Sequence, residues 1–296
     1  MTETLYGGIE AGGTKFVCMV AGGPEHIVDE VRFPTTTPDE TLQRVSDFFA
    51  PHLARLRGIG LGSFGPFDVD PESPTFGFVT TTPKPHWSNA DVLGALRKSL
   101  GLPIAIDLDV AVAGLGEARW GASQGIDPSL YITVGTGIGA GFVAGGRSFR
   151  GLVSPEMGHI RIPHDRSRDP FNGACPYHGD CFEGLAAGPS ILARFGQRAE
   201  TLAADHPFWD VEAEYIASAL VNYILILTPK KIILGGGVMQ NEFMFPKIRA
   251  KVQDLLKGYV NHPAILKDID GYIVPPALGN RAGVLGAIAL AMNSAA

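Results

Sequence analysis

Residues Tyr131–Phe142 read YITVGTGIGAGF, and this stretch decides how the rest of the chain is interpreted. The apolar run 131–134 predicts a buried strand, and a second strand is predicted from Ile138. Glycines at 135, 137, 139 and 141 remove alternate side chains, so a ligand can lie directly on the backbone. The N–H groups of such a turn cradle anions, and Thr136 adds a hydroxyl donor. The alternative is an ordinary tight turn that binds nothing.

A similar unit opens the chain at Tyr6–Val17, YGGIEAGGTKFV, where Gly12-Gly13-Thr14 separates two apolar runs. Two strand–turn–strand units of this kind suggest two related lobes that grip one polyphosphate. The length of 296 residues also exceeds what one compact core usually covers. We therefore expect a two-lobed α/β protein.

The composition excludes several classes of protein. With 45% hydrophobic and 18% charged residues, the chain is an ordinary globular protein. A net charge of −6 offers no basic patch, so nucleic acid is not an expected partner. No apolar stretch reaches the length of a membrane span, and the N-terminal MTETLYGG lacks the pattern of a signal peptide. The three cysteines are too few for a disulfide scaffold. These features predict a cytoplasmic protein.

In the first half, Pro38–Arg57 has a helical period with a kink expected at Pro51, and Ile59–Leu61 follows as a buried strand. The stretch Thr80–Asn89, TTTPKPHWSN, has two prolines and is expected to be irregular. Its Trp87 either lines a pocket or packs beneath a loop.

The strand predicted at Leu102–Leu108 runs directly into an Ala/Gly-rich helix. Two carboxylates, Asp107 and Asp109, stand on either side of Leu108 at this junction. Asp109 stands at the helix start, where it is either a simple N-cap or a carboxylate kept ionised by the helix dipole, as a catalytic base requires.

From Pro163 to Glu183 the chain is polar and aperiodic, longer than a structureless loop normally runs. It contains Cys175-x2-His178-x2-Cys181, and His159 lies just upstream. Two thiolates and two imidazoles fit a closed tetrahedral zinc site, whose charge balance favours a structural role. The alternative is a pair of loop cysteines beside solvated histidines.

The remaining chain is mainly helical, with helices expected at Pro189–Ala203, Val211–Leu227 and Arg281–Met292. Between the last two, a buried strand at Lys231–Leu234 ends in Gly235-Gly236-Gly237. Glycines there either let a flat ligand lie on the turn or permit tight helix packing.

Six motifs, taken together and in their order along the chain, resemble those of the ROK family (repressors, open reading frames and sugar kinases). They are IEAGGTKF, DLDVAVAGLGE, ITVGTGIGAGF, EMGH, CPYHGDCFEG and ILGGG. The resemblance spans nearly the whole chain. The stretches GSFGPFD and TTPKPHWSN are most similar to those of bacterial zinc-containing fructokinases.

The resemblance implies the actin-like (sugar kinase/hsp70-type) ATPase fold, with mixed sheets in two lobes around a central cleft that holds ATP and sugar. It implies a small lobe of residues 1–115 plus 281–296 and a large lobe of residues 116–280. A homodimer is the expected assembly. ATP, Mg²⁺ and a structural Zn²⁺ are the implied cofactors.

Residue by residue, the resemblance makes Asp109 the catalytic base. It implies nucleotide binding by two phosphate turns and an adenosine turn: Gly12, Gly13, Thr14 and Lys15; Gly135, Thr136 and Gly137; and Gly235, Gly236 and Gly237. It implies contact with the sugar by Glu156, Glu183 and Trp87. The implied metal ligands are His159, Cys175, His178 and Cys181, and His159 also lies near the sugar in this family.

Two positions depart from the family pattern. Ala111 stands where many members carry Asn, and Glu10 stands where many relatives of this fold carry Asp. Glu10 can still hold magnesium through water. The implied reaction is ATP-dependent phosphorylation of a hexose, D-fructose to fructose 6-phosphate. The alternatives are a broad-specificity gluco/mannokinase of the same family or a non-catalytic, sugar-responsive repressor; few residues precede the first phosphate turn to hold a DNA-binding segment.

Overall fold

The computed structural model describes residues 4–82 and 84–295, and the chain falls into two compact units. Unit 1 holds the chain up to Gly125, the segment Gly146–Pro155 and the stretch from Ala277 onward. Unit 2 holds Ile126–Gly145 and Glu156–Pro276. The lobes predicted from the sequence, whose residues 1–3 and 296 lie outside the described residues, stay a prediction. In the structure, residues 116–125, 146–155 and 277–280 group with unit 1.

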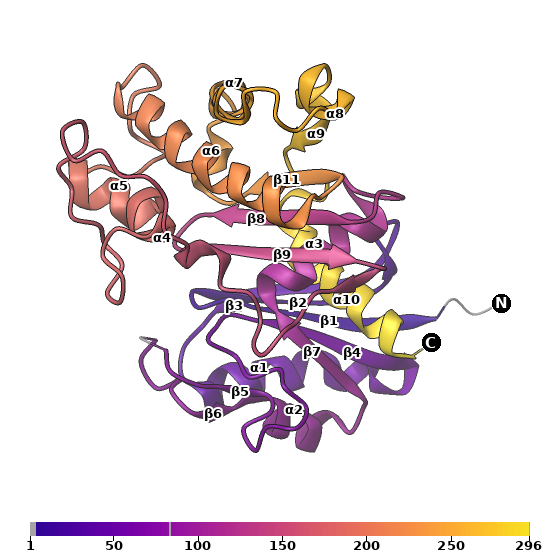
Figure 1. Cartoon of the computed structure of the whole chain (residues 1–296). Coiled ribbons are helices and arrows are strands. Elements are labelled where there is room, and N and C mark those ends of the chain that lie inside the picture. The colour runs from indigo at the N-terminus through magenta and orange to yellow at the C-terminus, as the bar shows by residue number, and fades with distance from the viewer. Residues whose placement is uncertain (1–3, 83, 296) are drawn as a thin grey trace. The chain divides into compact units, whose positions relative to one another are not determined.

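The sheet of unit 1 is mixed, with strands in the order β3-β2-β1-β4-β7. β2 and β3 run antiparallel to their neighbours on one side of β1, and β4 and β7 run parallel to it on the other side. Figure 1 shows these strands coloured by their position in the chain. The strands are β1 (Leu5–Ala11), β2 (Lys15–Gly23), β3 (His26–Pro34), β4 (Leu56–Ser63) and β7 (Ile104–Leu108). Ser63 pairs in register with Ala11 on one side and with Leu108 on the other. The first glycine turn and Asp109 therefore follow strand ends at the same edge of the sheet, the edge where α/β proteins place ligands.

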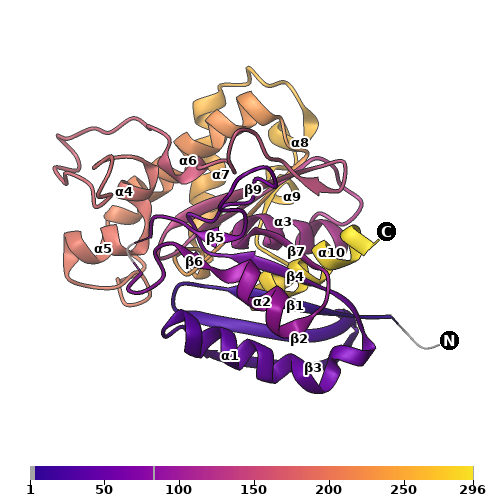
Figure 2. The ribbon, with the colours of Figure 1, turned by 90° about the horizontal axis from the view of Figure 1, so that it is seen from below.

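Helices cover both faces of this sheet. α1 (Pro38–Phe49) and α2 (Val92–Leu100) lie on one face, whereas α3 (Asp109–Trp120) and α10 (Ala282–Ala295) lie on the other, as Figures 1 and 2 show together. α10 packs along β1, β4 and α3. The shorter elements of unit 1 are the 3-10 helices η1 (Ala50–Arg55) and η4 (Gly279–Arg281) and the strands β5 (Phe78–Val79), β6 (Ala90–Asp91) and β10 (Arg147–Ser148).

Unit 2 repeats, as β9-β8-β11-β12, the arrangement of β2, β1, β4 and β7 in unit 1. β9 (Ile138–Ala144) pairs antiparallel with β8 (Ser129–Val134), and β11 (Lys231–Gly235) and β12 (Ile273–Val274) follow in parallel. Its α-helices are α4 (Phe182–Ala186), α5 (Gly188–Phe195), α6 (Phe208–Leu227), α7 (Met244–Leu256), α8 (Pro263–Leu266) and α9 (Ile269–Tyr272). Two 3-10 helices, η2 (Met157–His159) and η3 (Val238–Gln240), complete it. The glycine turn of residues 135–137 therefore occupies the same place in this sheet as the turn of residues 12–14 does in unit 1.

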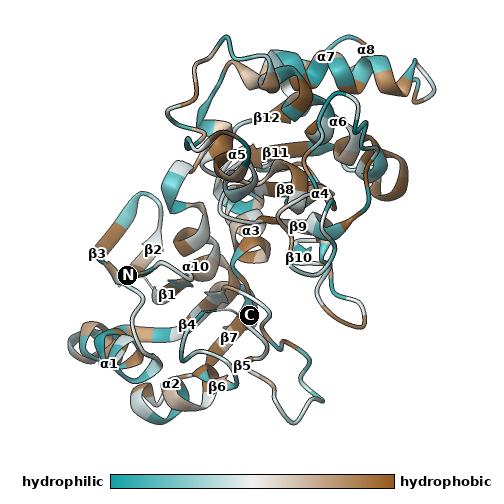
Figure 3. Cartoon of the chain, turned by 90° about the vertical axis from the view of Figure 1, so that its left-hand side faces the viewer, coloured by the Kyte–Doolittle hydropathy of each residue, from teal (hydrophilic) through white to brown (hydrophobic). Residues whose placement is uncertain are grey.

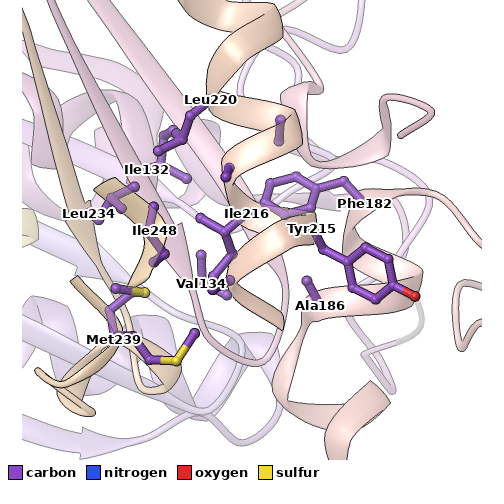
Figure 4. Packing of buried hydrophobic residues seen from close by; sticks show 14 of the residues in the cluster. Ile132, Val134, Phe182, Ala186, Tyr215, Ile216, Leu220, Leu234, Met239 and Ile248 are labelled. Carbon is purple, nitrogen blue, oxygen red and sulfur yellow. The ribbon is translucent and has the colours of Figure 1, made fainter. Parts of the chain in front are cut away.

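The core of unit 2 lies between its sheet and α6. Ile216 and Leu220 of α6 pack with Ile132 of β8 and Leu234 of β11, all of them buried (Figure 4). In the hydropathy view, β11 is strongly hydrophobic, whereas α7 carries a long hydrophilic stretch (Figure 3). Burial of these apolar side chains fixes the strand ends that carry the glycine turns, since it stabilises folding by about 25 cal/mol per Å² of apolar area.

Two of the expected helices end earlier than the sequence suggested. The helix from Pro38 stops at Phe49, and Pro51 lies in the 3-10 helix that leads to β4. α5 stops at Phe195 because Gly196 takes a left-handed φ of 65° and donates its N–H to Leu192. The predicted hairpin at residues 131–142 and the strand–helix junction at Asp109 are confirmed. Within residues 4–82 and 84–295, no helix has both the length and the apolar character needed to cross a membrane.

Candidate active site

The first glycine turn joins β1 to β2. The N–H of Gly12 donates to the Lys15 carbonyl at 3.0 Å. Thr35 braces the turn from outside, donating its N–H to the Thr14 carbonyl at 3.0 Å and its hydroxyl to the Gly12 carbonyl at 2.6 Å. The Thr14 and Lys15 side chains are exposed. The turn is thus held by its own backbone and by Thr35, and its lysine is accessible to an anion.

Glu10 lies one residue before the end of β1, and its carboxylate packs against the start of α10. A Cβ at Gly283 would lie 2.5 Å from the carboxyl carbon of Glu10, so a larger residue there would displace the Glu10 side chain. Burial raises the pKa of Glu10, against the opposing charges of Lys15 and Arg32. Within the described chain, its Oε2 has no hydrogen-bond partner. The expectation that Glu10 holds magnesium through water stays a prediction.

The two aspartates at the end of β7 have different environments. Asp107 has no exposed surface, and its Oδ2 lies 2.9 Å from the Arg150 guanidinium and accepts a hydrogen bond from Ser148. Asp109 is half-buried at the first position of α3, where its Oδ1 accepts the N–H of Val110 at 2.8 Å. Asp107 therefore anchors the segment Gly146–Pro155, whereas Asp109 is the aspartate of this pair that keeps partial access to solvent.

In unit 2, a pocket of about 340 Å³ opens beside the second glycine turn. The turn is closed by the N–H of Gly135 on the Gly137 carbonyl at 2.9 Å, and Gly188 at the start of α5 donates to the Gly135 carbonyl at 2.8 Å. The lining residues come from this turn, from α5 and the loop after it, and from the end of β11: Gly135, Thr136, Gly188, Pro189, Leu192, Arg198, Ala199, Glu200, Gly237 and Val238. A volume of this size is at the lower end of small-molecule sites, which span about 300–1,000 Å³.

The structure thus brings two of the predicted nucleotide turns into one pocket. Gly236 has a φ of +94°, and a Cβ there would lie 2.4 Å from the Val134 carbonyl oxygen, so the β11 turn lies directly on the end of β8. A Cβ added at Gly237 would have no heavy atom of the described residues within 4 Å, so this side of the pocket is open.

Four predicted metal ligands converge in unit 2. The ligand atoms of His159, Cys175, His178 and Cys181 all lie within 4.8 Å of one another. Nδ1 of His159 is 3.7 Å from the Cys175 sulfur and 3.6 Å from the Cys181 sulfur, and Nδ1 of His178 is 3.7 Å from Cys175. Bonds of about 2.3 Å to sulfur and 2.0–2.1 Å to nitrogen at tetrahedral angles place S and N about 3.5–3.6 Å apart. The donor set and its spacing fit zinc.

Polar contacts also order the loop around this cluster. Asp180 accepts from Arg161 at 2.6 Å and from Arg166 at 2.9 Å, and it lies 3.2 Å from His164. Further along, Asp169 forms a two-pronged ion pair with Arg194 and accepts the Tyr215 hydroxyl at 2.8 Å. No local pattern in the sequence indicates these anchors, because the partners are up to 46 residues apart.

The two predicted sugar-binding glutamates flank His159. Burial of the Glu156 carboxyl raises its pKa, the charge of His159 lowers it, and the charge of Glu183 raises it further. Glu156 as a whole residue is nevertheless exposed. Glu183, in the first turn of α4, accepts the N–H of Ile138 at 2.8 Å and lies 3.9 Å from Nε2 of His159. Both carboxylates therefore belong to the neighbourhood of the metal cluster.

Trp87 takes the second of the two roles considered for it. Its side chain has no exposed surface, its ring packs on Phe16 and Phe64, and its indole N–H donates to the Thr36 carbonyl at 2.8 Å. Direct contact with a sugar would need an exposed edge, so this structure supports packing under the loop of residues 80–89. Pro83 of that loop lies outside the described residues.

The sequence profile of the ROK family matches residues 6–294, almost the whole chain. The chain belongs to the ROK family. The fructokinase of Pediococcus pentosaceus is 43% identical to this ROK protein, covering 97% of both chains. The fructokinase of Streptococcus mutans serotype c is 42% identical, covering 99% of both. Both the family resemblance and the fold class expected from the sequence are confirmed.

Among solved structures, the ROK hexokinase of Thermus thermophilus superimposes on this ROK protein with a TM-score of 0.81. The two are 27% identical, and the match covers 98% of each chain. Sequence reasoning had not assigned Arg198 and Leu192 to the pocket of the ROK protein. Both lie in or after α5, and no local motif marks them because only packing of α5 beside the glycine turn brings them there.

Proposed function

We propose that this ROK protein transfers the γ-phosphoryl group of ATP to D-fructose and forms fructose 6-phosphate. One observation carries the kinase assignment: a single pocket is lined by the phosphate turn Gly135–Thr136 and by Gly237 of the adenosine turn. The sugar is proposed from the relatives, two of which are fructokinases 42–43% identical over nearly their full lengths.

In this proposal Asp109 is the general base. It accepts the proton of the fructose 6-hydroxyl as that oxygen bonds to the γ-phosphorus, and the bond from phosphorus to the bridging oxygen breaks to release ADP. A positioned base of this kind contributes about 10²–10⁴ in rate. Its half-buried place at the start of α3 supports the role, because the helix dipole favours the carboxylate form.

Backbone and charged groups would bind the nucleotide. The N–H groups of the turns at 12–14 and 135–137 suit the phosphates, with Lys15 as the neighbouring cation. Magnesium would neutralise the phosphate charge, and Glu10 is its proposed partner through water. Glu156 and Glu183 are proposed to accept hydrogen bonds from sugar hydroxyls.

The cluster of His159, Cys175, His178 and Cys181 is proposed to hold one structural zinc ion. The spacing of its ligand atoms supports this, and both sulfurs come from buried residues. The zinc would order the loop that ends at Glu183, so its role would be to shape the sugar site rather than to act on the phosphate.

The setting is part of the same proposal: a cytoplasmic homodimer whose partners are a small sugar and a nucleotide. The net charge of −6 supports neither nucleic acid nor an anionic membrane surface as a partner.

The test is kcat/KM for fructose, glucose, mannose and N-acetylglucosamine at saturating Mg-ATP, with ADP release measured in a coupled assay. We expect fructose to exceed glucose by at least about tenfold, because sugar-binding carboxylates left unpaired by the wrong hydroxyl pattern cost binding energy. Ala111, in place of a polar residue, works against such discrimination. Glucose or mannose equal to fructose would indicate the broad gluco/mannokinase, and no turnover with any sugar would indicate the repressor-type protein.

A further inference from the structure

The two carboxylate oxygens of Glu183 face different parts of unit 2. Oε2 accepts the N–H of Ile138 at 2.8 Å, and Ile138 is the first residue after the Gly135–Gly137 turn. A Cβ at Gly137 would lie 2.9 Å from the same oxygen. The carboxylate therefore lies directly against the turn proposed to hold phosphate.

Oε1 faces the metal cluster. It lies 3.9 Å from Nε2 of His159, whose Nδ1 is turned toward the two cysteine sulfurs. At this distance the carboxylate is an electrostatic neighbour of the outer nitrogen of His159 and not its hydrogen-bond partner. Glu183 is itself held in place by the short helix α4, whose N-cap is Cys181, with the Cys181 sulfur accepting the N–H of Gly184 at 3.4 Å.

We propose that Glu183 is a positioning residue for the second phosphate turn, in addition to its proposed contact with the sugar. The hydrogen bond that the Ile138 N–H donates to Oε2 fixes the point where the turn enters β9. This inference rests on the proposed function only in taking the turn as the site of ATP. The Glu183 side chain then lies beside both the metal cluster and the phosphate turn of unit 2, and it also takes part in the proposed sugar contact.

The chemistry of the side chain separates positioning from sugar binding. Glu183→Gln keeps a carbonyl oxygen that accepts the Ile138 N–H, whereas Glu183→Ala leaves that N–H without its acceptor. Neither variant changes the metal ligands themselves. Glu156→Ala is the matched control, because Glu156 is the other proposed sugar ligand and no hydrogen bond among the described residues joins its side chain to the turn.

The experiment measures the Kd of a non-hydrolysable ATP analogue by calorimetry with no sugar present, after zinc content and melting temperature have been checked. We expect Glu183→Ala to weaken binding by about fivefold to tenfold, the usual loss for one hydrogen bond. Glu183→Gln and Glu156→Ala should stay within about twofold of the wild type. The exchange rate of the Ile138 amide hydrogen should rise in Glu183→Ala and not in Glu183→Gln, and this readout serves even if the alanine variant loses metal.

Unchanged nucleotide affinity in Glu183→Ala, or an equal loss in Glu156→Ala, would overturn the positioning role and leave the kinase proposal standing. A wild-type protein that binds no nucleotide would instead overturn the proposed function, and this assignment with it. Slow exchange of Ile138 in both Glu183 variants would also contradict the positioning role.

Discussion

Glu117 accepts a hydrogen bond from the backbone N–H of Leu278, 161 residues further along the chain, at 2.9 Å. The other carboxylate oxygen of Glu117 accepts the N–H of Ala277 at 3.1 Å and of Ala122 at 2.7 Å. The side chain has no exposed surface. One buried carboxylate thus satisfies three backbone donors in the stretches where the chain leaves and re-enters unit 1.

We expect Glu117→Gln to lower the free energy of unfolding by about 2–4 kcal/mol, because an amide group turns its NH₂ toward at least one of these N–H donors and leaves it unpaired. Urea unfolding followed by circular dichroism measures the change. Glu25→Gln, on the exposed turn between β2 and β3, is the control and should change stability by less than about 0.5 kcal/mol. A Glu117→Gln protein as stable as the control would contradict the anchoring role.

Asp109→Asn should lower kcat by about 10²–10⁴ and leave ATP affinity and melting temperature nearly unchanged, because it removes the proposed base but keeps its shape. Asp107→Asn should do the reverse and mainly lower the melting temperature, since Asp107 is buried beside Arg150 at 2.9 Å. Steady-state kinetics and thermal unfolding on both variants distinguish these roles. Activity of Asp109→Asn within a few-fold of wild type would remove it as the base.

Purified protein should contain about one zinc per chain, and Cys181→Ala should lose the metal and melt at a lower temperature. Without a cation, burial raises the pKa of Cys181 to about 11. The thiol would then be neutral at pH 7, with no negative charge to pair with a metal ion. Elemental analysis and thermal unfolding provide the measurements. Cys18→Ala, in the core strand β2, is the control and should keep full metal content. Wild-type protein free of zinc after purification without chelators would rule the site out.

Two neighbouring glycines should respond differently to alanine. Gly237→Ala should fold normally and raise the KM for ATP several-fold, because the added methyl has no heavy atom of the described residues within 4 Å and projects into the open pocket. Gly236→Ala should destabilise the protein, by about 1–3 kcal/mol or more, since its φ is +94° and its methyl would meet the Val134 carbonyl. Thermal melts and ATP titrations of both variants test this pair. Equal stability of the two would show that the turn relaxes.

Features that depend on near neighbours could be predicted from the amino-acid order alone. Apolar periodicity and glycine content determine local structure over a few residues. They therefore predicted the glycine turns at 12–14 and 135–137, the strands around them and the helix that starts at Asp109. The four metal ligands, His159 and the Cys175–Cys181 cluster, could also be predicted, since residue type and close spacing are enough to suggest zinc. The early end of α5 was not predicted, because one glycine can lie within a helix or end it. In the structure Gly196 takes a left-handed conformation and ends the helix.

The relationships between distant segments became known from the packing of the folded chain. The sequence left Trp87 between a pocket and a packing role, and burial among Phe16 and Phe64 resolved it. It could not show that the turn at 135 and Gly237 line one pocket, or that Glu183 bonds to Ile138, 45 residues away. Such contacts depend on how sheets and helices pack to bury apolar surface, and no local pattern records which polar groups that packing brings together.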